Sequence, residues 1–191
     1  MSQFLAGERA ISTGFTGASV FNLNSKPLNF ILFQAVWFSC VLGAVYGRAW
    51  IGIAAAIFTA LVSVAGAESP QKRGMFILLV TLIGTLGDLV PLWLGAFAFT
   101  HPAAVPWGYP LWMSAIWLGF ATTLPASLGW LAGRLLLSAL FGFLGGPLAY
   151  LAGESLGAIV LGSDRVVSLL AIGIFWAMVT PFLMRLSKEM E

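Results

Sequence analysis

One carboxyl group stands inside a long apolar stretch: Asp88, among the aliphatic and aromatic side chains of residues 75–99. A helix needs about 20 residues to cross the hydrocarbon of a bilayer, so this stretch is predicted to be a membrane span. A carboxylate near the middle of a span is costly, and we expect Asp88 to face protein or trapped water and not lipid. Such a group could hold a proton, bind a cation or accept hydrogen bonds from another helix. Asp88 is therefore the first candidate site residue.

A second group of candidates lies on a later apolar stretch, where Gly142, Gly146, Tyr150 and Glu154 recur every four residues. This spacing places them on one helix face. If that helix is continuous, Glu154 lies at a similar depth to Asp88 or beyond it, and the two carboxyls could share a proton or clasp one cation. The alternative is that Glu154 reaches water near the helix end or pairs with Arg165.

Three further polar residues are candidates for proton or ligand binding. His101 is the single histidine and could give protons access to the span, although a solvated loop position is the preferred interpretation. Asn29 and Gln34 carry amides into the first apolar stretch, where amides usually link helices and a binding role is the alternative. One cysteine and one histidine cannot supply a zinc site, and no nucleotide or haem motif occurs. We expect neither a metal nor a cofactor.

The composition excludes an ordinary soluble protein. Of the 191 residues, 60% are hydrophobic and 8% are charged, whereas soluble domains carry about 25% charged residues. The basic residues are scattered and form no stripe that would bind nucleic acid. The chain is therefore predicted to be an all-α integral membrane protein, a polytopic transmembrane helix bundle.

Six apolar stretches are predicted to be spans: residues 28–46, 50–67, 75–99, 111–133, 134–161 and 166–186. We expect residues 1–27 to be a cytoplasmic or interfacial segment, 28–186 the transmembrane domain, and 187–191 a cytoplasmic tail. Gly145, Gly146 and Pro147 interrupt the fifth stretch, which indicates a kinked or broken helix; two separate crossings are the alternative. Glycine pairs four residues apart are predicted to mark close helix contacts. These pairs are Gly43 with Gly47, Gly129 with Gly133, Gly142 with Gly146, and Gly153 with Gly157.

The basic residues indicate how the chain is threaded. With six spans and a cytoplasmic N-terminus, seven Lys and Arg lie inside and two, Arg48 and Arg165, lie outside. The inner set is Arg9, Lys26, Lys72, Arg73, Arg134, Arg185 and Lys188. This asymmetry follows the positive-inside rule and places both termini in the cytoplasm. The same topology predicts an outer aromatic belt of Tyr46, Trp50, Trp107, Tyr109 and Trp112.

The chain resembles a bacterial inner-membrane family catalogued only as a domain of unknown function. The similarity covers residues 28–186 and depends on motifs in four of the predicted spans. These are Asn29, Gln34, Trp37 and Phe38; Asp88; Pro110, Trp112, Met113 and Trp117; and Gly145, Gly146, Pro147, Tyr150, Gly153, Leu156, Gly157 and Ala158. Members are often encoded near cyclopropane-fatty-acid-synthase-like methyltransferases, so the resemblance implies a role beside membrane lipid modification in the bacterial inner membrane.

Three functions fit these observations. The first is an accessory or lipid-binding protein with a polar pocket between the third and fifth spans, whose partners are membrane lipid and a membrane protein. The second is a small proton-coupled carrier with a carboxyl site between the same spans. The third is a membrane-embedded enzyme acting on an acyl chain, with Asp88 or Glu154 as general base and His101 or Tyr150 nearby.

Overall fold

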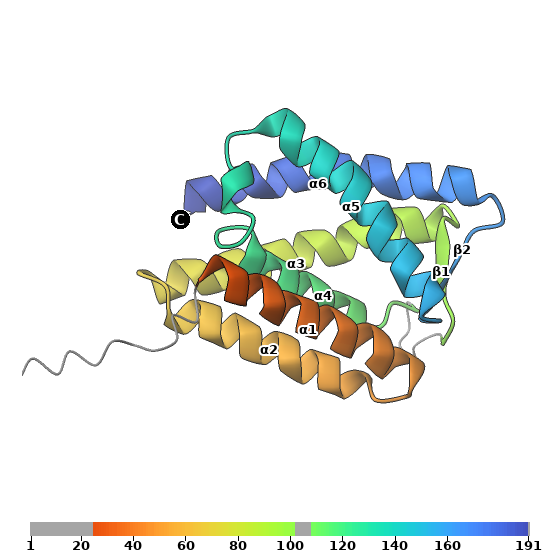
Figure 1. Cartoon of the computed structure of the whole chain (residues 1–191), viewed down its shortest axis with the longest axis horizontal. Coiled ribbons are helices and arrows are strands. Elements are labelled where there is room, and N and C mark those ends of the chain that lie inside the picture. Colours follow the sequence, from red (N-terminus) through yellow and green to blue (C-terminus); the bar gives the residue numbers. More distant parts are fainter. Residues whose placement is uncertain (1–24, 102–107, 191) are drawn as a thin grey trace, which may run out of the picture.

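The architecture comes from a computed structural model, which describes residues 25–101 and 108–190. Most of the predicted N-terminal segment, 1–27, lies outside the described residues. Within them the chain forms six α-helices and two short strands (Figure 1). The helices are α1 (Lys26–Val45), α2 (Ala49–Ala65), α3 (Pro70–Trp93), α4 (Leu111–Thr123), α5 (Leu135–Ser155) and α6 (Arg165–Met190); the strands are β1 (Phe97–Phe99) and β2 (Ile159–Leu161).

The lengths and composition of the helices are those of a membrane protein. Among the described residues, α1, α3, α5 and α6 are long and apolar enough to cross a bilayer, while α2 and α4 are shorter apolar helices. The helix α1 begins, and α6 ends, at the same end of the molecule (Figure 1). Six spans with cytoplasmic termini stay a prediction.

Interior prolines do not interrupt the long helices. Pro91, Pro147 and Pro181 lie inside α3, α5 and α6 respectively. In a membrane, neighbouring helices and hydroxyl side chains can satisfy the carbonyl groups that proline leaves without a donor. Because α5 continues from Leu135 to Ser155 through Pro147, the alternative of two separate crossings in residues 134–161 is wrong.

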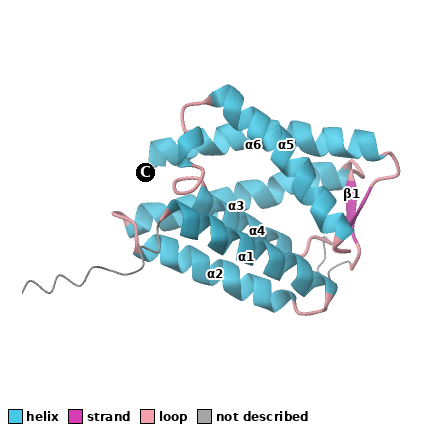
Figure 2. Cartoon of the chain, in the orientation of Figure 1, coloured by secondary structure: helices cyan, strands magenta, loops and turns pink. Residues whose placement is uncertain are grey.

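Three predicted spans end earlier than their apolar stretches do, at Trp93, Thr123 and Ser155. Residues 97–99 and 159–161, expected to be helical, form an antiparallel ladder with Phe97 opposite Leu161 and Phe99 opposite Ile159 (Figure 2). Gly95 and Gly157 adopt φ values of 71° and 88°, which end a helix and turn the chain. The predicted tail is also different, because α6 continues to Met190.

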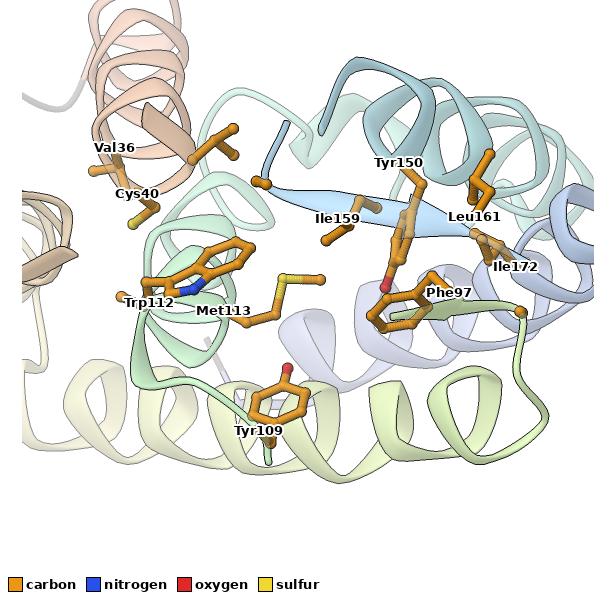
Figure 3. Close-up of a cluster of buried hydrophobic side chains, with 14 of the residues drawn as sticks. Val36, Cys40, Phe97, Tyr109, Trp112, Met113, Tyr150, Ile159, Leu161 and Ile172 are labelled. Carbon is orange, nitrogen blue, oxygen red and sulfur yellow. The ribbon is translucent and has the colours of Figure 1, made fainter. Parts of the chain in front are cut away.

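The helices pack as a four-helix unit and a hairpin. α2 and α4 pack against each other, and each of them contacts both α1 and α3. α5 packs mainly on α6, and the hairpin joins the unit through α3 with α6 and through the strand ladder. Buried side chains form two clusters, one near each end of the bundle. The cluster beside the ladder includes Tyr109, Trp112 and Tyr150 (Figure 3).

Candidate functional site

The carboxyl group of Asp88 is fully buried, with 0% of the residue exposed. Tyr109 Oη and Trp117 Nε1 donate to Oδ2 at 3.0 and 2.7 Å, and Tyr150 Oη donates to Oδ1 at 2.8 Å. The three donors come from the segment before α4, from α4 and from α5. In Figure 3 the hydroxyl groups of both tyrosines extend toward the space between their rings. Asp88 therefore connects α3 with α4, with the segment before α4, and with α5.

The position of Asp88 along its helix differs from the prediction. α3 begins at Pro70 and ends at Trp93, so Asp88 lies five residues before its end and not near its middle. At 1.5 Å per residue, the separation from the helix end is about 8 Å. The group is still sheltered by protein, as the cost of exposing a carboxyl to lipid requires.

Close packing and ring contacts position the donors. A Cβ at Gly84, one turn before Asp88, would collide with the ring of Trp117, so this glycine allows the indole to lie against α3. Trp117 also stacks on Trp176, with ring centroids 4.8 Å apart and planes at 9°. The rings of Tyr109 and Tyr150 make edge contacts with Phe99 and Phe97 of the ladder, respectively. The ladder thus holds both tyrosines in place.

A cavity of about 420 Å³ lies beside this cluster. One wall is aromatic and comes mainly from α1 and α4, and the opposite wall is a stripe of small residues on α5. The aromatic wall contains Phe30, Phe33, Trp37, Phe38, Trp112, Trp117 and Phe120, and the small stripe contains Gly142, Gly145, Gly146, Ala149, Ala152 and Gly153. Asp88, Tyr150 and Trp176 also line the cavity. The arrangement is a slot suited to an apolar chain or a flat ring.

The cavity opens sideways, between α1 and α5. Five of its lining residues are also exposed on the helix surface: Phe30 (50%) and Phe38 (48%) on α1, and Phe141 (39%), Leu148 (64%) and Ala152 on α5. In a helix bundle embedded in a bilayer, a surface of this composition faces lipid. The cavity therefore communicates with the surface expected to contact acyl chains.

The two amide candidates have different surroundings. Asn29 is buried; its Nδ2 donates to the Thr122 carbonyl oxygen at 3.2 Å, and its Oδ1 accepts from Ser127 Oγ at 2.8 Å. It links α1 to the end of α4, as an amide between helices is expected to do. Gln34 lines the cavity and makes no hydrogen bond to another described residue. Of the two amides, Gln34 is the one available to a ligand.

The structure does not bring Glu154 or His101 to Asp88. Glu154 Oε1 accepts from the backbone N–H of Leu161 at 3.0 Å, and Oε2 pairs with Arg165 at 2.7 Å. These contacts tie α5 to β2 and α6, so a site of two adjacent carboxyls is not formed. His101 is exposed and does not line the cavity. Among the described residues, no group of three or more His, Cys, Asp and Glu is arranged to hold a metal ion.

Sequence reasoning missed Tyr109 and Trp117 as partners of Asp88. The spacing of Gly84, Asp88, Pro91 and Gly95 predicts a shared helix face. The first three are buried on α3, but the prediction is wrong for Gly95, which lies beyond the helix end with a φ of 71°. That spacing does not say which segment covers the face. Trp117 occurs in the motifs that carry the family resemblance, and this was the one signal that could have found it.

A family model described as "protein of unknown function (DUF2878)" matches residues 26–182. The chain belongs to this family. The DUF2878 region includes Asp88 with its three donors and every residue that lines the cavity. Neither the curated proteins nor the solved structures contain a match to the chain.

Proposed function

We propose that this DUF2878 protein is a membrane lipid-binding accessory protein, whose cavity holds the hydrocarbon part of a membrane amphiphile. The observation that carries the proposal is the slot between α1, α4 and α5 and its sideways opening at Phe30, Phe38, Phe141 and Leu148. Through such an opening a chain can pass from the bilayer without crossing water.

The dimensions of the cavity support a chain-like ligand. A volume of about 420 Å³ lies within the range of small-molecule sites, roughly 300–1,000 Å³. Its α5 wall extends from Phe141 to Gly153, which at 1.5 Å per residue is about 18 Å along the helix. An apolar slot of this length favours hydrocarbon over water because burial of apolar surface is favourable and water finds few polar partners there.

The biological setting extends the same proposal. The resemblance described above implies a bacterial inner-membrane protein encoded near methyltransferases that act on acyl chains. We infer that the protein works beside such lipid-modifying chemistry, with membrane lipid as its ligand and a membrane protein as its partner. The apolar helices and the family support a membrane protein, and the lipid role is what the experiments below test.

Filling the cavity should remove bound lipid. A Cβ at Gly145 would meet no atom within 4 Å, so Gly145→Phe is expected to place its ring in the slot without forcing the helices apart. Leu144→Phe is the matched control, because Leu144 is 59% exposed on the same helix and does not line the cavity. Mass spectrometry of the purified proteins should find lipid retained by the wild type and by Leu144→Phe, and lost by at least about tenfold in Gly145→Phe. Equal lipid in all three proteins would contradict the proposal.

The link to lipid modification predicts an altered membrane when the gene is deleted. Lipid profiles of the deletion strain should differ from those of the parent in acyl-chain composition. Complementation with Leu144→Phe should restore the parental profile, and complementation with Gly145→Phe should not. An unchanged lipid profile in the deletion strain would contradict the proposed link to lipid modification. Lipid binding itself is tested separately, by mass spectrometry of the purified proteins.

The proton-coupled carrier is a second candidate because Asp88 on α3 is hydrogen-bonded to Tyr150 on α5. This carboxyl joins the four-helix unit to the hairpin of α5 and α6. Its protonation could therefore be coupled to a movement of one relative to the other. Substrate-driven proton flux in proteoliposomes that is lost in Asp88→Asn would favour the carrier. The acyl-chain enzyme keeps one of its predicted pairs, Asp88 with Tyr150, but neither His101 nor Glu154 lines the cavity.

A further inference from the structure

The charged groups that line the cavity are acidic and not basic. Asp88 is the single charged residue that lines it, and no Lys, Arg or His of residues 25–101 and 108–190 does so. No basic side chain in that part of the chain pairs with Asp88. Its partners are two tyrosine hydroxyls and one indole N–H, which are neutral donors. These donors hold both oxygens of the carboxyl but bring no positive charge to it.

The aromatic wall adds to the same preference. The faces of Trp, Tyr and Phe rings carry negative electrostatic potential and attract ammonium groups, most strongly where water is excluded. Trp37, Trp112, Trp117, Tyr150 and Trp176 all line the cavity. Clusters of aromatic rings are a recurrent binding site for quaternary ammonium groups. An anionic head group in the same place would be repelled by Asp88, and no basic residue lines the cavity to offset this repulsion.

We propose that the cavity selects an amphiphile with a cationic ammonium head group, whose chain lies along the small stripe of α5. This inference rests on the proposed function and names its ligand class. Asp88 borders the cavity but has no exposed surface of its own, so the ammonium group contacts the aromatic rings. Asp88 acts through its field, which a low-dielectric surrounding screens little. It is therefore a positioning and selectivity residue.

Two amphiphiles with the same chain and opposite permanent charges test this selectivity. Tetradecyltrimethylammonium and tetradecyl sulfate, both radiolabelled, are dialysed to equilibrium against the protein in a neutral maltoside detergent, with empty micelles as the blank. The wild-type protein should bind the ammonium compound at least about tenfold more tightly than the sulfate. Asp88→Asn, which keeps the shape of the side chain, should reduce this ratio to near one.

Gln34 provides a test that does not depend on the folding of an Asp88 variant. Gln34 lines the cavity without a hydrogen-bond partner among the described residues, so its replacement leaves no group orphaned. Gln34→Glu should raise the ammonium-to-sulfate ratio and Gln34→Lys should invert it, because the two variants change the charge of the slot in opposite directions. Gln34→Glu does so at nearly constant volume.

The outcomes separate this inference from the function it rests on. If the wild type binds both amphiphiles equally and Gly145→Phe blocks both, the cavity binds chains without charge selection and the inference is overturned. If neither amphiphile shows binding that Gly145→Phe removes, the cavity does not bind chains and the proposed function is overturned with it. A ratio that favours the ammonium compound and follows the charge at Gln34 supports both.

Discussion

Asp88→Ala is expected to lower the free energy of unfolding by at least about 3 kcal/mol, a large fraction of the stability of a typical domain. The substitution leaves Tyr109 Oη, Trp117 Nε1 and Tyr150 Oη without their acceptor in a buried site. Each buried donor left unsatisfied costs about 1–3 kcal/mol. The contacts between α3, α4 and α5 at this end of the bundle should loosen together.

Two conservative variants show whether the hydrogen bonds cause this effect. Tyr150→Phe removes one donor and keeps the ring against Phe97, so it should cost about 1–2 kcal/mol. Asp88→Asn keeps one carbonyl oxygen and should fall between Tyr150→Phe and Asp88→Ala. Denaturation in detergent, followed by circular dichroism and tryptophan fluorescence, measures all three. An Asp88→Ala protein as stable as Tyr150→Phe would show that the three donors find other partners.

The sheltering of Asp88 could be predicted from the sequence because it follows from an energetic cost. A carboxyl within an apolar stretch of residues 75–99 must be covered whatever the rest of the fold does. The spacing of Gly84, Asp88 and Pro91, four and then three residues apart, also predicts the buried face of α3, since a helix has 3.6 residues per turn. The same spacing extended to Gly95 is wrong, because α3 ends at Trp93. Both inferences use only local geometry and solvation.

The partners of Asp88 could not be predicted because they depend on tertiary packing. Tyr109 and Trp112 were assigned to an outer aromatic belt together with Tyr46 and Trp50. Tyr46 and Trp50 are 73% and 68% exposed, whereas Tyr109 and Trp112 are 9% and 6% exposed. An aromatic residue at the predicted end of a span can point to lipid headgroups or to the protein interior. The choice depends on which neighbouring segment is close enough to cover it.

The ends of the helices could not be predicted for a different reason. Hydropathy measures how apolar a stretch is and not the conformation of its backbone, so apolar strands such as residues 97–99 and 159–161 are read as parts of a span. Glycines with positive φ at positions 95 and 157 turn the chain before each strand. A sequence shows that a glycine is present but not whether its freedom of φ is used.

The glycine pairs illustrate the same ambiguity. Gly47, Gly133 and Gly157 adopt positive φ at turns outside the α-helices, so three of the four pairs do not lie along one helix face. Gly142 and Gly146 both lie inside α5, and a Cβ at either would collide with Trp176 on α6. Close helix packing thus explains the pair Gly142 and Gly146, whereas the second glycine of each other pair serves a turn.

Gly142→Ala and Gly145→Ala should have opposite effects although they are the same chemical change on the same helix. At Gly142 the added methyl would collide with the Trp176 carbonyl oxygen and approach the Thr180 hydroxyl. The carbonyl belongs to the backbone of α6 and cannot rotate away, so the two helices must separate at a cost of about 1–3 kcal/mol. At Gly145 the methyl meets open space in the cavity, and the higher helix propensity of alanine should stabilise α5 by up to about 1 kcal/mol.

The comparison tests whether the stripe of small residues on α5 has two roles. Unfolding in detergent should give a lower midpoint for Gly142→Ala and an equal or higher midpoint for Gly145→Ala. Because the loss of backbone freedom is the same in the two variants, the difference between them reports mainly the contact with α6. If Gly145→Ala destabilised as much as Gly142→Ala, residue 145 would face a packed surface and the slot would not be open there. A destabilised Gly142→Ala beside a tolerated Gly145→Ala would instead show that glycine at 142 serves packing, while glycine at 145 keeps space for a ligand.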